Sequence, residues 1–283
     1  MTDIPADARP IYNAPSARLG DRVRAATGDL LDGWRRRELW TALGFEELKR
    51  RYHGTALGLF WSIASYGLFV GIFILVFGVF GSAHLPSYSV HVSVGWLVWT
   101  LLSNLFIGGS TVFFRAGPWI AGTAMPYTTF IFRDVWIELL LAGAAASVVV
   151  LIIALSGAPW STMMLLAFPG FALCILFGFA AALALGVICL RLKDLRFVTQ
   201  VGVRAAFFLT PILWEYDPTV DTLRTRLAIW NPVTHFLEIV REPLAGNLPS
   251  AMNYAVAGGT TLATMLVAFA LFAGFRRRIP LWA

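Results

Sequence analysis

The sequence predicts an all-α integral membrane protein with six transmembrane helices, and three observations lead to that fold class. Hydrophobic residues make up 58% of the 283 residues, whereas charged residues make up 13%. Six long apolar stretches recur, and at about 1.5 Å per residue most of them can cross a hydrocarbon core roughly 30 Å thick. The apolar and polar alternation of a membrane barrel is absent from the sequence. Because backbone polar groups in lipid must be paired internally, helices are expected at Leu59–Gly81, Val92–Phe114, Val135–Leu155, Met163–Leu190, Phe197–Trp214 and Met252–Phe275.

The distribution of the 22 Lys and Arg residues orients these helices. Nineteen lie before the first stretch, in the second-to-third connection, around the junction of the fourth and fifth stretches, or after the sixth, and only three lie in the long loop after Trp214. By the positive-inside rule the nineteen face the cytoplasm, so both chain termini are expected there. The high proportion of basic residues therefore reflects membrane topology and gives no support to nucleic-acid binding.

The residues before the first stretch divide into two parts. Residues 1–34 are polar, contain Pro5, Pro10 and Pro15 and lack an apolar signal-peptide core, which predicts a flexible cytoplasmic tail. Residues 35–58 mix charges with aromatic side chains and predict an amphipathic interface segment. Because Gly44 separates two apolar faces, two short helical pieces are expected there. The six-span domain then occupies residues 59–275, and residues 276–283 form a second cytoplasmic tail.

The connections between the stretches predict two further short helices. In Arg115–Asp134 the breakers Gly117, Pro118, Gly122 and Pro126 predict a short helix on the cytoplasmic side. In the long outer loop, Asn231 and Pro232 are typical of an N-cap and a first helical position, and Pro243 and Gly246 predict the end of that helix. It is too short to span, so it is expected at the outer interface or as a re-entrant element.

Several kinds of chemistry have no motif in this chain. A Walker A loop needs Lys between Gly and Ser or Thr, and the only lysines, Lys49 and Lys193, are not in that context. No nucleophile, base and orienting group stand together, and the four histidines match no metal-site spacing, so no catalytic, cofactor-binding or metal-binding residue is assigned. Glu138 lies near the start of the third stretch, and we expect it to form an ion pair with Arg133 or a hydrogen bond rather than a proton relay.

Aromatic residues give the richest positive pattern. Helical spacing places Tyr66, Phe69, Phe73, Phe77 and Phe80 on one face of the first stretch. Such a stripe is compatible with packing, but flat rings also suit the C–H faces of sugars, so a substrate channel is assigned to Tyr66, Phe69, Phe73 and Phe77. Six tryptophans lie near predicted span ends and fit the interfacial belt, namely Trp96, Trp99, Trp119, Trp136, Trp160 and Trp214.

Three segments together resemble a known family: FEELKRRYHGTALGLFW at Phe45–Trp61, FFLTPILW at Phe207–Trp214, and NPVTHFLEIVREPLAG at Asn231–Gly246. They resemble the permease subunits of bacterial polysaccharide ABC exporters of the type-2 permease family. The resemblance extends over about residues 35–275, although residues 1–34 are longer than the family pattern needs.

The resemblance implies a homodimer of six-span permeases in the bacterial inner membrane, working with two copies of a separate ATPase subunit that binds ATP and Mg²⁺. Its implied substrate is a lipid-linked polysaccharide such as O-antigen. The implied ATPase-docking residues are Phe45, Leu48, Arg115, Trp119 and Ile120. The implied outer-gate residues are Asn231, Phe236 and Arg241.

Two other functions stay open at this stage. A multispan membrane acyl- or glycosyltransferase would require paired polar catalytic groups in or beside the spans. A small-molecule or drug exporter of the same permease type would share the fold and the partner ATPase. The sequence does not distinguish among O-antigen, capsule, galactan and teichoic acid as the exported glycan.

Overall fold

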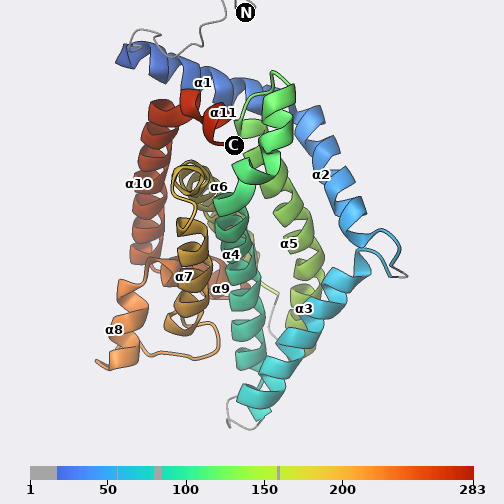
Figure 1. Ribbon diagram of the computed structural model, residues 1–283. Coiled ribbons are helices and arrows are strands. Elements are labelled where there is room, and N and C mark those ends of the chain that lie inside the picture. The colour runs from blue at the N-terminus through green and yellow to red at the C-terminus, as the bar shows by residue number, and fades with distance from the viewer. Residues whose placement is uncertain (1–17, 56, 80–84, 158–159) are drawn as a thin grey trace, which may run out of the picture.

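The computed structural model describes residues 18–55, 57–79, 85–157 and 160–283, and these residues contain helices and connecting turns but no strand (Figure 1). The α-helices are α1 (Leu19–Arg35), α2 (Arg37–Tyr52), α3 (Phe60–Phe73), α4 (Leu85–Gly122), α5 (Thr128–Ser156), α6 (Ala167–Arg191), α7 (Leu195–Leu209), α8 (Leu223–Trp230), α9 (Pro232–Leu244), α10 (Ala251–Phe275) and α11 (Ile279–Trp282). A π-helical segment, Ile74–Val79, continues α3, and 3₁₀ turns at Thr162–Leu166 and Arg276–Arg278 precede α6 and α11.

The long helices form one bundle, and α1 lies across one end of it (Figure 1). We call this end the α1 end. Segments near the two ends of the chain meet there, because Asp29 of α1 forms an ion pair with Arg276 just after α10. Arg191 at the end of α6 also lies over the Phe275 ring.

Five of the helical segments are long and apolar enough to cross a membrane, and the chain is a multipass membrane protein. Among the described residues these segments are Phe60–Gly78, Leu85–Gly122, Thr128–Ser156, Thr162–Arg191 and Ala251–Trp282. The fifth predicted stretch differs, because α7 has only 15 residues, about 22 Å, and ends at Leu209. Thr210 is extended and Pro211 follows it, and a proline both lacks an N–H and disfavours helical geometry in the residue before it. The count of six membrane crossings stays a prediction.

Helix α4 is longer than its predicted stretch at both ends, with 38 residues from Leu85 to Gly122. Pro118 lies inside the helix and does not end it. The buried side chain of Ala116 and the packing of α11 against α4 support this last part of the helix. The prediction of a separate short helix in Arg115–Asp134 is therefore wrong, because α4 continues to Gly122 and α5 begins six residues later at Thr128.

Small residues let α4 and α6 approach closely. Gly178, Ala182 and Gly186 recur at every fourth position and form one ridge of α6. A Cβ atom built on Gly178 would lie 2.3 Å from Leu105 Cδ1, and one built on Gly109 of α4 would lie 2.4 Å from Ala182 Cα. In lipid, where helices gain little from burying apolar surface, such close backbone contact is a main source of association.

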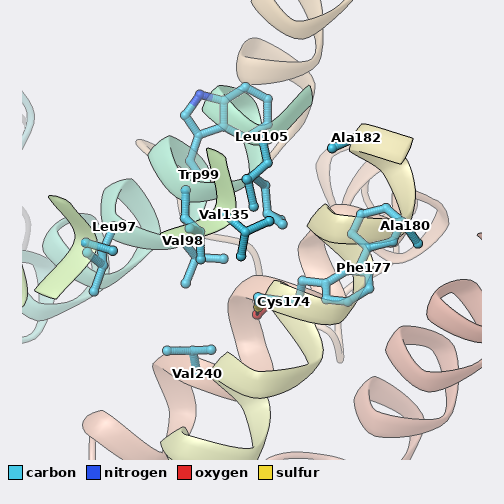
Figure 2. Packing of buried hydrophobic residues seen from close by; sticks show 14 of the residues in the cluster. Leu97, Val98, Trp99, Leu105, Val135, Cys174, Phe177, Ala180, Ala182 and Val240 are labelled. Atoms are coloured by element: carbon cyan, nitrogen blue, oxygen red, sulfur yellow. Dashed lines mark hydrogen bonds between the residues drawn. The ribbon is translucent and has the colours of Figure 1, made fainter. Parts of the chain in front are cut away.

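The core surrounds this contact. Figure 2 shows side chains from α4, α5, α6 and α9 meeting in one cluster, among them Leu105, Val135, Phe177 and Val240. Phe177 stacks on the fully buried Phe236 of α9, with ring centroids 4.4 Å apart and an interplanar angle of 14°. The sequence pattern did not reveal that α9 belongs to the core.

The N-terminal residues 19–35 are helical and not the flexible tail that the sequence predicts; the three prolines behind that prediction lie outside the described residues. Asp29 attaches α1 to the bundle, because its buried carboxylate accepts hydrogen bonds from the backbone N–H groups of Tyr127 (3.2 Å) and Thr128 (3.0 Å). It also accepts a 2.9 Å hydrogen bond from Nε of Arg276. These partners lie about 100 and 247 residues away, so no local pattern could show them.

Helix α2 is also continuous, whereas two short pieces were expected around Gly44. Gly44 is buried against α5, and a Cβ atom there would lie 2.8 Å from Cδ1 of Trp136. The glycine is therefore a position of close helix packing and not a break in the helix. This contact explains why it interrupts the apolar pattern of the segment.

Candidate functional site

The predicted aromatic stripe does not form one uniform face. Tyr66 is buried, and its hydroxyl donates a hydrogen bond to the carbonyl of Ser93 on α4. Phe69 and Phe77 are 51% and 44% exposed, and Phe73 is half-buried. Phe80 lies outside the described residues. Only part of the stripe is thus open to a ligand, lipid or second protein.

The exposed part belongs to an aromatic cluster that joins three helices. Trp96 of α4 lies at its centre, with ring-centroid distances of 6.0 Å to Phe69, 5.3 Å to Phe73 and 5.7 Å to Phe207 of α7. Trp99 contacts the same Phe207 ring at 5.9 Å. Helix α4 begins at Leu85, so both indoles lie inside the helix and not at its end, and their assignment to the interfacial belt stays a prediction.

A groove of about 220 Å³ opens beside this cluster, between α3, α4, α5 and the end of α2. Phe69 and Trp96 form its aromatic wall. Its polar lining consists of Tyr52, Ser62, Ser65, Tyr66, Thr100, Asn104 and Glu138. A concave surface that combines flat rings with hydroxyl, amide and carboxylate groups can bind a ligand that is apolar on its faces and polar on its edge.

Glu138 occupies the polar part of the groove and does not pair with Arg133. Asn104 Nδ2 donates a 2.9 Å hydrogen bond to Glu138 Oε2. Arg133 instead bonds its sequence neighbour Asp134, at 3.0 Å from Nε and 2.8 Å from Nη2, and Arg115 pairs with Asp134 as well. The expected ion pair is therefore wrong and the expected hydrogen bond is confirmed, with Asn104 as a partner that the sequence did not reveal.

A larger cavity of about 650 Å³ lies between α2 and the adjoining ends of α4 and α5, and we call it the α2 cavity. Its lining is mainly charged: Glu46, Glu47, Lys49, Arg50, His53, Arg115 and Arg133, with Leu43, Trp119 and Phe130. Arg50 pairs with Glu47 across one turn of α2. Charges of both signs in an open cavity can pair with complementary charges of a protein partner.

The residues assigned to ATPase docking divide between this cavity and the interior. Arg115 and Trp119 line the α2 cavity, and Trp119 is 46% exposed. Phe45 is exposed and contacts Trp136 of α5 edge to face. Leu48 is buried, and Ile120 is half-buried against the core, so neither offers much surface.

The three residues assigned to an outer gate lie in or beside α9. Asn231 is the N-cap, as predicted, since its side chain accepts a 3.0 Å hydrogen bond from the N–H of Val233, while Pro232 is the first helical residue. Phe236 is fully buried. Arg241 is 4% exposed, pairs with Glu238 at 2.8 Å and donates to the carbonyl of Pro211 at 2.9 Å.

Helix α9 is enclosed by α4, α6 and α10 and so lies inside the bundle. Its expected place, at the outer interface or as a re-entrant element, stays a prediction. Two glycines permit the close approach. A Cβ atom on Gly95 of α4 would lie 2.5 Å from Nη2 of Arg241, and one on Gly170 of α6 would lie 2.5 Å from the carbonyl oxygen of Ile239. The buried Glu238 and Arg241 of α9 are held there by their ion pair.

Beside α9, at the end opposite α1, lies an open cavity of about 550 Å³ whose charged lining includes Glu215, Glu238, Arg241 and Glu242. Burial and the nearby Glu238 raise the pKa of Glu242, although Asn247 opposes the shift with a hydrogen bond. Burial and Glu238 also raise the pKa of Tyr216, to about 12. In the described part of the chain no three His, Cys, Asp or Glu side chains are placed to hold a metal ion.

Comparison with known proteins gives three relatives, each named O-antigen export system permease protein RfbA. Two are from Klebsiella pneumoniae, at 24% identity over 181 residues (64% of this chain and 70% of the relative) and 23% over 206 residues (72% and 79%). The third, from Myxococcus xanthus, is 24% identical over 203 residues (71% and 78%). No family model matches the chain. These relatives confirm the resemblance to polysaccharide-export permeases.

Proposed function

We propose that this chain is the membrane-spanning subunit of an ATP-driven exporter that moves a lipid-linked polysaccharide across the bacterial inner membrane. In this proposal two copies of the chain form the conduit, and two separate ATPase subunits bind ATP and Mg²⁺ and drive its opening. The observation that carries the proposal is the aromatic cluster of α3, α4 and α7 beside an open groove, in a chain similar to O-antigen permeases.

The aromatic cluster suits a moving glycan. The ring of Trp96 contacts those of Phe69, Phe73 and Phe207, and the Phe69 and Phe73 rings contact each other. The ring centroids are between 5.3 and 6.4 Å apart. Flat rings attract the C–H faces of sugars without the directional demands of hydrogen bonds, so successive residues of a polymer can slide past them. A path of this kind requires no catalytic group in the chain.

The exposed face of α7 supports an assembly of two copies. Its exposed side chains include Phe197, Val201, Phe208 and the cation Arg204. Arg204 lies nine residues after the start of α7, about 14 Å along the helix, and a guanidinium at that depth is costly against lipid. A second copy packed beside a hydrated path would cover the apolar side chains and give Arg204 polar surroundings.

The α1 end supports docking of the ATPase subunits on the cytoplasmic side. It carries the basic residues that the positive-inside rule assigns to the cytoplasm, and the α2 cavity opens there between charged side chains of both signs. Asp134 pairs with both Arg115 of α4 and Arg133 of α5 and so links the two helices. A displacement of Trp119 by the ATPase would therefore be transmitted to the start of α5. Both termini would then be cytoplasmic.

Aromatic-to-leucine variants test the conduit. Leu keeps much apolar volume but lacks the flat electron-rich face, so Phe69→Leu, Phe73→Leu and the double variant should reduce polysaccharide at the cell surface per assembled transporter. Phe168→Leu is the matched control, because Phe168 is 72% exposed on α6 and lies outside the cluster. Export by the double variant equal to that of the control would contradict the proposal. A membrane transferase would instead lose glycan synthesis, and no lipid-linked polysaccharide would accumulate inside.

Cysteine crosslinking tests the docking surface. A photoactivatable thiol reagent on Trp119→Cys should capture the ATPase subunit in membranes. Trp160→Cys, which replaces a 65% exposed tryptophan following α5 at the opposite end, should not capture it. Equal capture at both positions, or capture only at Trp160→Cys, would contradict this part of the proposal.

A further inference from the structure

From the geometry of the groove we infer that Asn104 and Glu138 form a subsite that binds hydroxyl groups of a neutral sugar residue while Phe69 and Trp96 hold its ring face. This inference rests on the proposed function, since it places the sugar in the groove of the export path. It adds a site for one sugar unit and a preference for uncharged over acidic glycans.

The depth of Glu138 is the first argument. The residue lies ten positions after the start of α5, about 15 Å along a helix that is long enough to cross the membrane. Ionisable side chains at such depth are expensive and face a partner or a hydrated cavity. Among the described residues no ion pair to Glu138 is present: Arg51 and Arg115 line an adjoining cavity with it, but neither forms an ion pair with it, and Arg115 pairs with Asp134. The carboxylate is therefore directed to the groove and to Asn104.

The unused hydrogen-bonding capacity is the second argument. A carboxylate has about four acceptor positions, and the bond from Asn104 uses one of them. Asn104 is exposed and keeps its amide oxygen and one further N–H for other partners. Two adjacent hydroxyls of a sugar could thus donate to Glu138 and exchange a bond with Asn104. The hydroxyls of Ser62 and Thr100 donate to backbone carbonyls of their own helices, so toward a ligand they offer acceptor positions.

The opposite wall supplies the complementary surface. Phe69 and Trp96 line the same groove, with centroids 6.0 Å apart and planes inclined at 36°, and Phe69 is half-exposed. A pyranose ring has apolar C–H faces and a polar hydroxyl rim, which matches an aromatic wall beside a carboxylate and an amide. The groove of about 220 Å³ is smaller than the roughly 300–1,000 Å³ pockets of drug-sized ligands, so it fits a single sugar unit at a time.

The negative charge of Glu138 makes the subsite prefer neutral over acidic sugar residues. A uronic acid or phosphate substituent would place a second anion beside Glu138, where the low dielectric strengthens repulsion. A neutral residue with neighbouring hydroxyls meets no such cost and gains hydrogen bonds to a charged acceptor, which are stronger than bonds between neutral groups.

Photocrosslinking from the groove wall tests the subsite. Ser65 lines the groove and is exposed, so Ser65→p-benzoylphenylalanine in the complete transporter should capture glycan in cells that make a neutral lipid-linked polysaccharide. Capture should fall about tenfold with Glu138→Ala and should fall with Asn104→Ala as well, because each removes hydrogen bonds that involve a charged group. Ser147→Ala, an exposed position on the same helix whose hydroxyl bonds its own backbone, should leave capture unchanged.

Glu138→Gln separates recognition from folding, since it keeps the shape and removes the charge. In cells that make a uronic-acid glycan, this variant should raise capture relative to the parent chain. Equal capture in Glu138→Ala and Ser147→Ala would overturn the subsite, and so would capture of the acidic glycan that Glu138→Gln does not change. Neither result would contradict the export path. Absence of glycan capture from Ser65 in every background would contradict the path itself, and with it the subsite.

Discussion

Asp29→Ala should loosen the attachment of α1 to the bundle. The Asp29 side chain is fully buried, and its carboxylate accepts hydrogen bonds from the backbone N–H groups of Tyr127 and Thr128 and pairs with Arg276 at 2.8 Å. The Thr128 hydroxyl also donates to the carboxylate at 2.9 Å. Removing the carboxylate leaves two N–H groups at the start of α5 without their acceptor and the guanidinium without its counter-ion.

The magnitude follows from these partners. Removing one member of a buried ion pair costs about 3–5 kcal/mol. The lower end applies here, since the Arg276 side chain is 30% exposed and can be rehydrated. A loss of about 3 kcal/mol corresponds to a decrease of roughly 5–10 °C in the midpoint of thermal unfolding for a chain of this size.

Thermal unfolding of the purified protein in lipid nanodiscs measures the effect. Asp32→Ala is the matched control, because Asp32 is exposed one turn further along α1 and should shift the midpoint by less than about 2 °C. The unfolding midpoint of Asp29→Asn should lie between those of the two alanine variants, since its amide oxygen still accepts a hydrogen bond from Thr128 while the charge is lost. A midpoint for Asp29→Ala equal to that of Asp32→Ala would show that the α1 attachment is not held by this carboxylate.

Three further predictions concern packing, pH dependence and topology. Gly109→Ala should destabilise the fold by about 2 kcal/mol, because its Cβ would lie 2.4 Å from a backbone atom of α6. The control Gly143→Ala places its Cβ where nothing lies within 4 Å, so it should be neutral or slightly stabilising. Equal unfolding midpoints for the two variants would contradict the close α4–α6 contact. The raised pKa of Glu242 means that the folded state binds a proton more tightly than the unfolded state, so this group disfavours folding as pH rises above about 4.5. Glu242→Gln should therefore raise the unfolding midpoint at about pH 8 and lose this advantage near pH 4, and an advantage independent of pH would refute the assignment. A cysteine at Thr222 should react with an impermeant thiol reagent from outside the cell and one at Thr123 should not, and reversed labelling would remove the cytoplasmic assignment of the α1 end.

The membrane character, most of the passes and the α9 cap could be predicted from the sequence because each depends on local physics. A run of about 20 apolar residues is detectable wherever it packs, and Asn231 before Pro232 specifies a helix start through one side chain and its own backbone. The relation to polysaccharide-export permeases was also visible in three local segments. The predicted end of the fifth stretch, at Trp214, was wrong, because α7 ends at Leu209, shortly before Pro211.

The candidate site was only partly predictable, because its members come from different helices. The stripe on α3 identified Phe69 and Phe73, but Trp96 and Phe207 join them only when α4 and α7 pack alongside. Glu138 was visible as an acid in an apolar stretch, yet its partner Asn104 lies 34 residues away. Spacing along one helix can report which residues share a face, but it carries no information about which other helix meets that face.

The sequence by itself determined that this chain is a multipass helical membrane protein, since apolar length and capping residues act over a few turns, and three local segments showed its similarity to polysaccharide-export permeases. Only the tertiary structure decided that α1 is an ordered helix, that α9 lies inside the bundle, and that Gly44 and Gly109 are contact points. In each case the deciding interaction is a close approach or a buried charge pair between distant segments, such as Asp29 with Arg276. Such interactions depend on the packing of whole helices, and a linear pattern does not encode them in any one place.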